Sequence, residues 1–154
     1  MTKRTAWLAV LVTAIALCLS SRPALALTET VVAMAGSGTF PPGTVYQGYP
    51  LSTLRYGVGA SVFSDGTATG DVDITCVGSQ GTYTVEGTPT SGSVPKAGVV
   101  FFSGTCTVDM GDGTVYSNVS FSVTADSTKQ TLKIVIGTAT LNIATGVKGR
   151  ITIK

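Results

Sequence analysis

Residues 68–76 read Ala-Thr-Gly-Asp-Val-Asp-Ile-Thr-Cys, and this stretch decides the fold. Val72, Ile74 and Cys76 occupy even positions, and polar residues occupy the odd positions between them. Successive side chains of a β-strand point to opposite faces of a sheet. The pattern therefore predicts a strand with one buried and one solvated face.

The same alternation recurs on both sides of this stretch. It runs through residues 54–62, 100–108 and 115–123, and shorter apolar runs lie at 31–35, 83–85, 132–136, 141–143 and 151–153. No window keeps the period of an amphipathic helix. Eight or nine strands joined by short turns predict an all-β domain. We expect an antiparallel β-sandwich, with a small β-barrel as the alternative.

Turn residues separate these runs. Asp65-Gly66 and Asp112-Gly113 are typical of β-hairpin turns. Gly137 stands where the apolar residues change parity, which indicates a bulge or a tight turn. Residues 87–97 contain Pro89 and Pro95 and are predicted to form the longest loop.

The first 26 residues are typical of a secretory signal peptide. Lys3 and Arg4 precede an apolar run over 7–19, and the small residues Ala24 and Ala26 form a cleavage site. The run of 13 residues is shorter than the roughly 20 that a membrane-spanning helix needs. We therefore expect a signal at 1–26 and one mature domain at 27–154. Lipidation at Cys18 is an alternative that the bulky Leu17 disfavours.

Export changes the charge balance and the expected partners. Loss of Lys3, Arg4 and Arg22 leaves seven basic and eight acidic residues, a net charge of −1. No basic stripe remains that would follow a nucleic acid, and no second apolar run is long enough to span a membrane. The expected location is extracellular or in the cell envelope, and the signal is bacterial in style.

Cys76 and Cys106 are the two cysteines of the predicted mature chain. Each falls on the apolar side of its strand, and the expected compartment is oxidising. We therefore expect one buried disulfide between them. It would stabilise the fold by roughly 3 to 4 kcal/mol in the chain-entropy model.

The chain contains no histidine. This excludes histidine-dependent catalytic triads and removes the commonest zinc ligand, so we predict no metal and no cofactor. Asp71 and Asp73 lie about 7 Å apart on one strand face, a spacing compatible with a glycosidase-type carboxylate pair. A solvated charged face is the simpler interpretation, because a catalytic acid must be desolvated.

Tyr46 and Tyr49 lie in a Gly- and Pro-rich segment and are candidate contacts for a protein or a carbohydrate. The favoured hypothesis is an exported, non-catalytic β-domain with a binding or surface-structural role, its possible binding surface formed by Tyr46, Tyr49, Asp71 and Asp73. Three alternatives remain. They are a secreted hydrolase that uses Asp71, Asp73 or Glu86, a small barrel that carries an apolar ligand, and assembly by exchange of the segment 27–35 between copies.

Overall fold

A computed structural model describes residues 26–142 and 145–154, and within them all regular structure is β-strand. The signal expected at 1–26 and Cys18 lie outside the described residues, except for Ala26. The strands are β1 (Glu29–Thr39), β2 (Val45–Tyr46), β3 (Tyr49–Phe63), β4 (Ala68–Gly78), β5 (Gly81–Lys96), β6 (Val99–Asp109), β7 (Val115–Asp126), β8 (Thr131–Ile136), β9 (Ala139–Asn142) and β10 (Thr145–Ile153).

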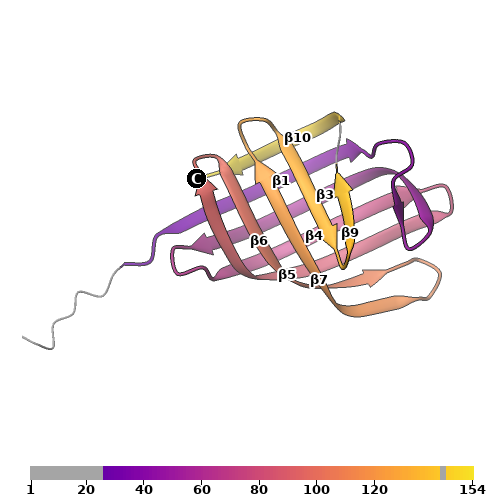
Figure 1. Ribbon diagram of the computed structural model, residues 1–154, viewed down its shortest axis with the longest axis horizontal. Helices are drawn as coiled ribbons and strands as arrows, with labels where there is room; N and C mark the ends of the chain where they lie inside the picture. Colours follow the sequence, from indigo (N-terminus) through magenta and orange to yellow (C-terminus); the bar gives the residue numbers. More distant parts are fainter. Residues whose placement is uncertain (1–25, 143–144) are drawn as a thin grey trace, which may run out of the picture.

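All these strands belong to one antiparallel sheet (Figure 1). Its order is β10-β1-β3-β4-β5-β6-β7-β8-β9, and β2 pairs separately with β3. Every neighbour from β3 to β9 is also the next strand in sequence, as short turns require. β1 and β10 depart from this rule, because β1 pairs with β3 past the short β2, and β10 pairs with β1 at the edge of the sheet.

The sheet curls around its own buried face, and its β7–β9 part crosses in front of β1, β3 and β4 in Figure 1. Val58, Val72, Val85, Phe102 and Val123 all project inward and belong to one apolar cluster. Alternate residues therefore supply a single core, which confirms the predicted all-β class. The expected two-sheet sandwich is not confirmed, because one continuous sheet connects these strands.

A glutamine side chain links the two opposite sides of the strand order, β8 and the edge strand β10. Gln130 precedes β8, and its side-chain amide donates to the carbonyl of Ile151 on β10 at 3.1 Å. Its oxygen accepts from the Ile151 N–H at 2.9 Å. Ile151 thus gains on its free edge the two hydrogen bonds that a neighbouring strand would supply.

The antiparallel register gives the curled sheet two ends. The β2–β3, β4–β5 and β6–β7 turns lie at one of them, on the right in Figure 1. The start of β1 and the β3–β4, β5–β6 and β7–β8 turns lie at the other. We call the first the aromatic end, because Tyr46, Tyr49, Tyr83 and Tyr116 lie there.

Residues 87–97 do not form the predicted loop, because β5 extends through Lys96. Pairing with β4 ends at Gly87, so the rest of β5 pairs in register with β6 alone. Pro89 is tolerated there because the strand has lost one neighbour. Register shifts between Pro89 and Ser91 and between Ser93 and Lys96 mark bulges in this half of β5.

The expected disulfide is absent, and Cys76 and Cys106 are free thiols. The register explains this difference. Cys76 of β4 pairs with Tyr83 of β5. Cys106 of β6, the neighbour on the opposite side of β5, pairs with Gly87 of β5. Two strand spacings and four residues along β5 separate the cysteines by roughly 16 Å. A disulfide needs Cα atoms within about 7 Å.

Candidate functional site

The predicted carboxylates Asp71, Asp73 and Glu86 come together on the outer face of the sheet. They line a shallow hollow of about 440 Å³ with Thr88 and Thr107. Asp73 lies directly opposite Glu86 on the neighbouring strand. All three carboxylates are exposed to solvent.

This acidic hollow lacks the surroundings that acid catalysis needs. A catalytic acid typically lies in a desolvated cleft, whereas these carboxylates lie in an open hollow on the outside of the sheet. Within residues 26–142 and 145–154, no three His, Cys, Asp or Glu side chains are arranged to hold a metal ion. The arrangement can therefore present negative charge to a partner.

Tyr46 lies buried at the aromatic end, with 5% of its surface exposed. The two-residue turn Gln47-Gly48 folds β2 back on β3, and both turn residues adopt positive φ, 49° and 86°. Burial raises the pKa of the Tyr46 hydroxyl above its usual value. Smaller contributions come from Cys106, Tyr116 and Cys76, which places the ring near both thiols and near β7.

Tyr49 and Tyr83 form an aromatic pair at the same end. Their ring centroids lie 5.4 Å apart with the planes inclined by 54°. Tyr83 is 2% exposed, and its hydroxyl has no hydrogen-bond partner among the described residues. Burial raises the pKa of Tyr83, and the nearby Tyr49 and Asp112 raise it further.

Asp112 holds the β6–β7 turn beside this pair. Its carboxylate accepts the Thr114 N–H at 2.8 Å. That bond lowers the pKa of Asp112, and the Tyr49 hydroxyl contributes to the same effect. A charged acceptor therefore stands next to the half-buried Tyr49.

Exposed apolar side chains surround these groups. Val45, Val115 and Tyr116 are 52%, 53% and 42% exposed. Tyr116 pairs with the inward-facing Val108, so its ring lies on the inner face of the sheet. It stays exposed because β8 pairs with β7 only from Phe121 onward. A bulge at Asn118, where φ is 58°, precedes that point.

The structure divides the four predicted binding residues between two places. Tyr46 and Tyr49 lie at the aromatic end, whereas Asp71 and Asp73 lie on the outer face of β4. Sequence reasoning did not place Tyr83, Tyr116 and Asp112 with the first pair. The sequence showed only that these three residues lie close to turns. Which turns lie at the same end of the sheet depends on the strand register, which the sequence does not show.

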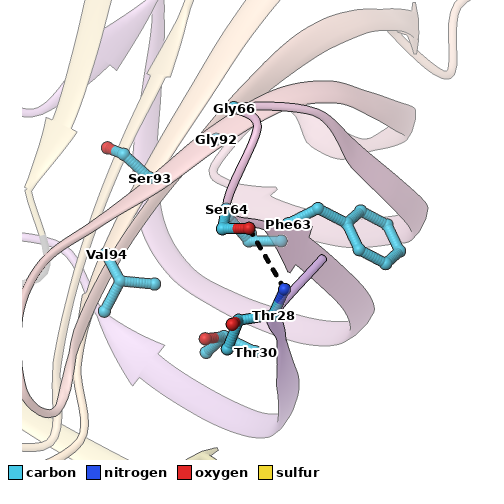
Figure 2. A pocket seen from close by; sticks show the side chains of 9 residues that line it. Thr28, Thr30, Phe63, Ser64, Gly66, Gly92, Ser93 and Val94 are labelled. Carbon is cyan, nitrogen blue, oxygen red and sulfur yellow. Dashed lines mark hydrogen bonds between the residues drawn. The ribbon is translucent and has the colours of Figure 1, made fainter. Parts of the chain in front are cut away.

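A second hollow, of about 340 Å³, opens at the other end of the sheet. Figure 2 shows Ser93 and Val94 on one side and Thr28 and Ser64 on the other. The Thr28 N–H donates to the Ser64 hydroxyl at 3.1 Å (Figure 2). None of the nine lining residues is charged. The hollow therefore offers hydroxyl and backbone groups to a ligand but no charged side chain.

Comparisons with protein-family models, with curated proteins and with solved structures found no match. The described residues include no helix that is long and apolar enough to cross a lipid bilayer.

Proposed function

We propose that this chain is an exported, non-catalytic binding domain whose aromatic end contacts a protein partner. Export rests on the charge, apolar run and cleavage-site order of residues 1–26. The expected place of action is outside the cytoplasm, in the envelope or beyond it.

One observation carries the choice of surface. Six large hydrophobic side chains are exposed in the described residues, three of them (Val45, Val115 and Tyr116) at the aromatic end and three (Leu27, Val31 and Val94) toward the other end. The only aromatic ring among the six is that of Tyr116, at the aromatic end. The half-buried Tyr49 lies at the same end. Tyrosines with apolar neighbours are typical of protein interfaces, where burial of the rings supplies much of the binding energy.

The surroundings of the ionisable groups support a binding role over a catalytic one. The Asp71, Asp73 and Glu86 carboxylates stand in solvent, on the outside of the curled sheet. Burial raises the pKa of Cys76 to about 12 and that of Cys106 to about 11. Such thiols are protonated at neutral pH and are poor nucleophiles.

We also propose that the curled sheet acts as a small closed barrel, which keeps the aromatic end rigid. The Gln130 bonds to Ile151 support closure. The chain supports it as well, because Asn142 of β9 and Thr145 of β10 are three residues apart. Three peptide links span at most about 11 Å. The end of β9 therefore lies close to the start of β10.

Site-specific photocrosslinking in the native host tests the proposed surface. A photoreactive residue is placed at Val115 or Tyr116 in one set of variants and at Val94 in a matched control. Val94 is 43% exposed, like Tyr116, but lies at the other end of the sheet. We expect a discrete protein adduct from positions 115 and 116 only.

Two results contradict the proposal. Equal adducts from position 94 would show that contact is not selective for the aromatic end. Absence of any protein adduct, with retention of the chain on a cell-wall glycan that Tyr116→Ala abolishes, would instead assign the surface to carbohydrate.

A further inference from the structure

Most charges on the outer face of the sheet between β10 and β6 are sorted by sign. Lys96 at the end of β5 and Lys133 on β8 are exposed basic side chains outside this pattern. Basic side chains lie on or next to β10 and on β3. They are Lys148 and Arg150 on β10, Lys154 directly after it, and Arg55 on β3. Acidic side chains project from β4, β5 and β6, and they are Asp71, Asp73, Glu86 and Asp109. All eight are exposed. Glu29 on β1 is the acidic exception near the basic side, and its carboxylate accepts the Ser61 hydroxyl at 2.6 Å.

The basic side forms a trough along β1. Its floor is low because the outward-facing residues of β1 and β3 include Ala33, Ala35, Gly57 and Gly59. One hollow of about 360 Å³ is lined by Arg150 and Lys154. A second of about 280 Å³ lies between Lys148 and Arg55. We call this surface the basic trough.

The acidic side is the outer face described above, extended by Asp109. Its centre is the hollow of about 440 Å³ around Asp71, Asp73 and Glu86. Asp109 lies on β6, directly opposite Thr84 of β5. We call this surface the acidic face.

The two surfaces match in spacing as well as in sign. Lys148 and Arg150 are two residues apart on β10, and Asp71 and Asp73 are two residues apart on β4. Outward side chains of a strand repeat every 7 Å or so, so both charges of one pair can face both charges of the other. Complementary potentials of this kind steer association and set its register.

We propose that the basic trough of one copy docks on the acidic face of a second copy, so that the protein associates head to tail. The inference does not depend on the aromatic end. The two surfaces adjoin, because Gly57 and Gly59 of the trough floor pair with Asp73 and Asp71 of β4. Two copies can therefore make this contact reciprocally in a closed pair, or each copy can pass it on to the next in a ring or an open chain.

A second copy explains the pattern better than an unrelated polyanion does. A polyanion would account for the basic trough and would leave the acidic face without a role. The predicted mature chain carries a net charge of only −1, so overall repulsion between copies is small. Exposed ion pairs are individually weak, so we expect reversible association that needs a high local concentration.

Sedimentation velocity of the secreted protein over a concentration series tests this inference. We expect the weight-average sedimentation coefficient to rise with concentration at about 0.01 M salt and to stay at the monomer value at about 1 M salt. A monomer at every concentration in low salt would overturn the proposal.

Charge reversal provides the specific test. Lys148→Glu with Arg150→Glu should weaken self-association by at least about tenfold, and so should Asp73→Lys with Glu86→Lys. The matched control is Lys96→Glu with Lys133→Glu, which changes the net charge equally outside the trough and should weaken association less than about threefold. Circular dichroism checks that each variant is folded.

Mixing the two reversed variants separates docking from a general charge effect. One variant keeps its original acidic face and the other keeps its original basic trough, so the mixture should associate through these two unchanged surfaces where neither variant does alone. If the mixture stays monomeric, the head-to-tail contact is wrong. If the acidic reversal leaves self-association unchanged, the acidic face is not the docking surface and the proposal is overturned.

Discussion

At the residue scale, the two thiols show how a buried side chain responds to its surroundings. Cys76 and Cys106 are 3% and 4% exposed, and neither has a charged partner that would stabilise a thiolate. Desolvation alone raises both pKa values. The thiols act in the fold as small apolar groups that fill the core beside Tyr46.

This predicts a loss of stability at alkaline pH. The thiols titrate near pH 9.0 in an unperturbed chain, but only at about pH 12 and about pH 11 in the folded state. Above pH 9 the unfolded chain therefore binds fewer protons than the folded chain, so the free energy of unfolding falls as pH rises. Below pH 9 this contribution is fully present.

Urea unfolding at a series of pH values measures this dependence. The double variant Cys76→Ala, Cys106→Ala should show a flatter decline between pH 9 and 10 than the original chain. Its lower stability at neutral pH does not affect that comparison, because the slope is the readout. Equal slopes would mean that the thiols do not titrate as described, for instance because they are oxidised to a disulfide.

At the element scale, strand pairing depends on small residues at points of close approach. A Cβ on Gly104 of β6 would overlap the Thr88 carbonyl oxygen and the Pro89 Cα of β5. Gly59 on the outer face of β3 has open space around its Cβ position. Both glycines lie within strands, but only one of them supports a tight backbone contact.

Gly104→Ala should therefore lower the free energy of unfolding by about 2 kcal/mol or more, since β5 and β6 must move apart. Gly59→Ala is the matched control and should raise it by up to about 1 kcal/mol, because alanine restricts the unfolded chain. Denaturant titration of both variants checks the pair. Equal destabilisation by the two substitutions would contradict the register of β5 and β6.

The Gln130 contact makes a prediction about the edge of β10. Gln130→Ala leaves the Ile151 N–H and carbonyl without their partners, at a cost of about 1 to 3 kcal/mol. The neighbouring, exposed Lys129→Ala should change stability by less than about 0.5 kcal/mol. Hydrogen exchange of the Ile151 amide should speed up in the first variant only. Unchanged exchange there would show that Gln130 does not hold this edge.

Several elements could be predicted from the sequence because their cause is local. Alternation places β3, β4, β6 and β7, and Gly137 marks the two-residue turn between β8 and β9. The β2 strand is two residues long, too short to show a period. The second half of β5 was missed because prolines usually end a strand, and the loss of one neighbour there is not a local property.

At the scale of the whole molecule, strand order determines which side chains meet. Tyr46 and Tyr49 were singled out from their segment, but their neighbours Tyr83 and Tyr116 come from β5 and β7. The same order places the cysteines on either side of β5 and sorts most of the outer charges by sign. None of these relations follows from the alternation of apolar and polar residues. Alternation shows which face of the sheet a side chain occupies, but not which residues of other strands lie beside it.

The central claim is therefore the order of strands in one curled sheet, and cross-strand nuclear Overhauser effects test it most directly. We expect Met34 of β1 to show contacts to both Ile151 of β10 and Val58 of β3, its register partners. We also expect contacts from Cys76 to Tyr83 and from Cys106 to Gly87. Contacts from Met34 to one neighbour only, or a direct contact between Cys76 and Cys106, would contradict the account.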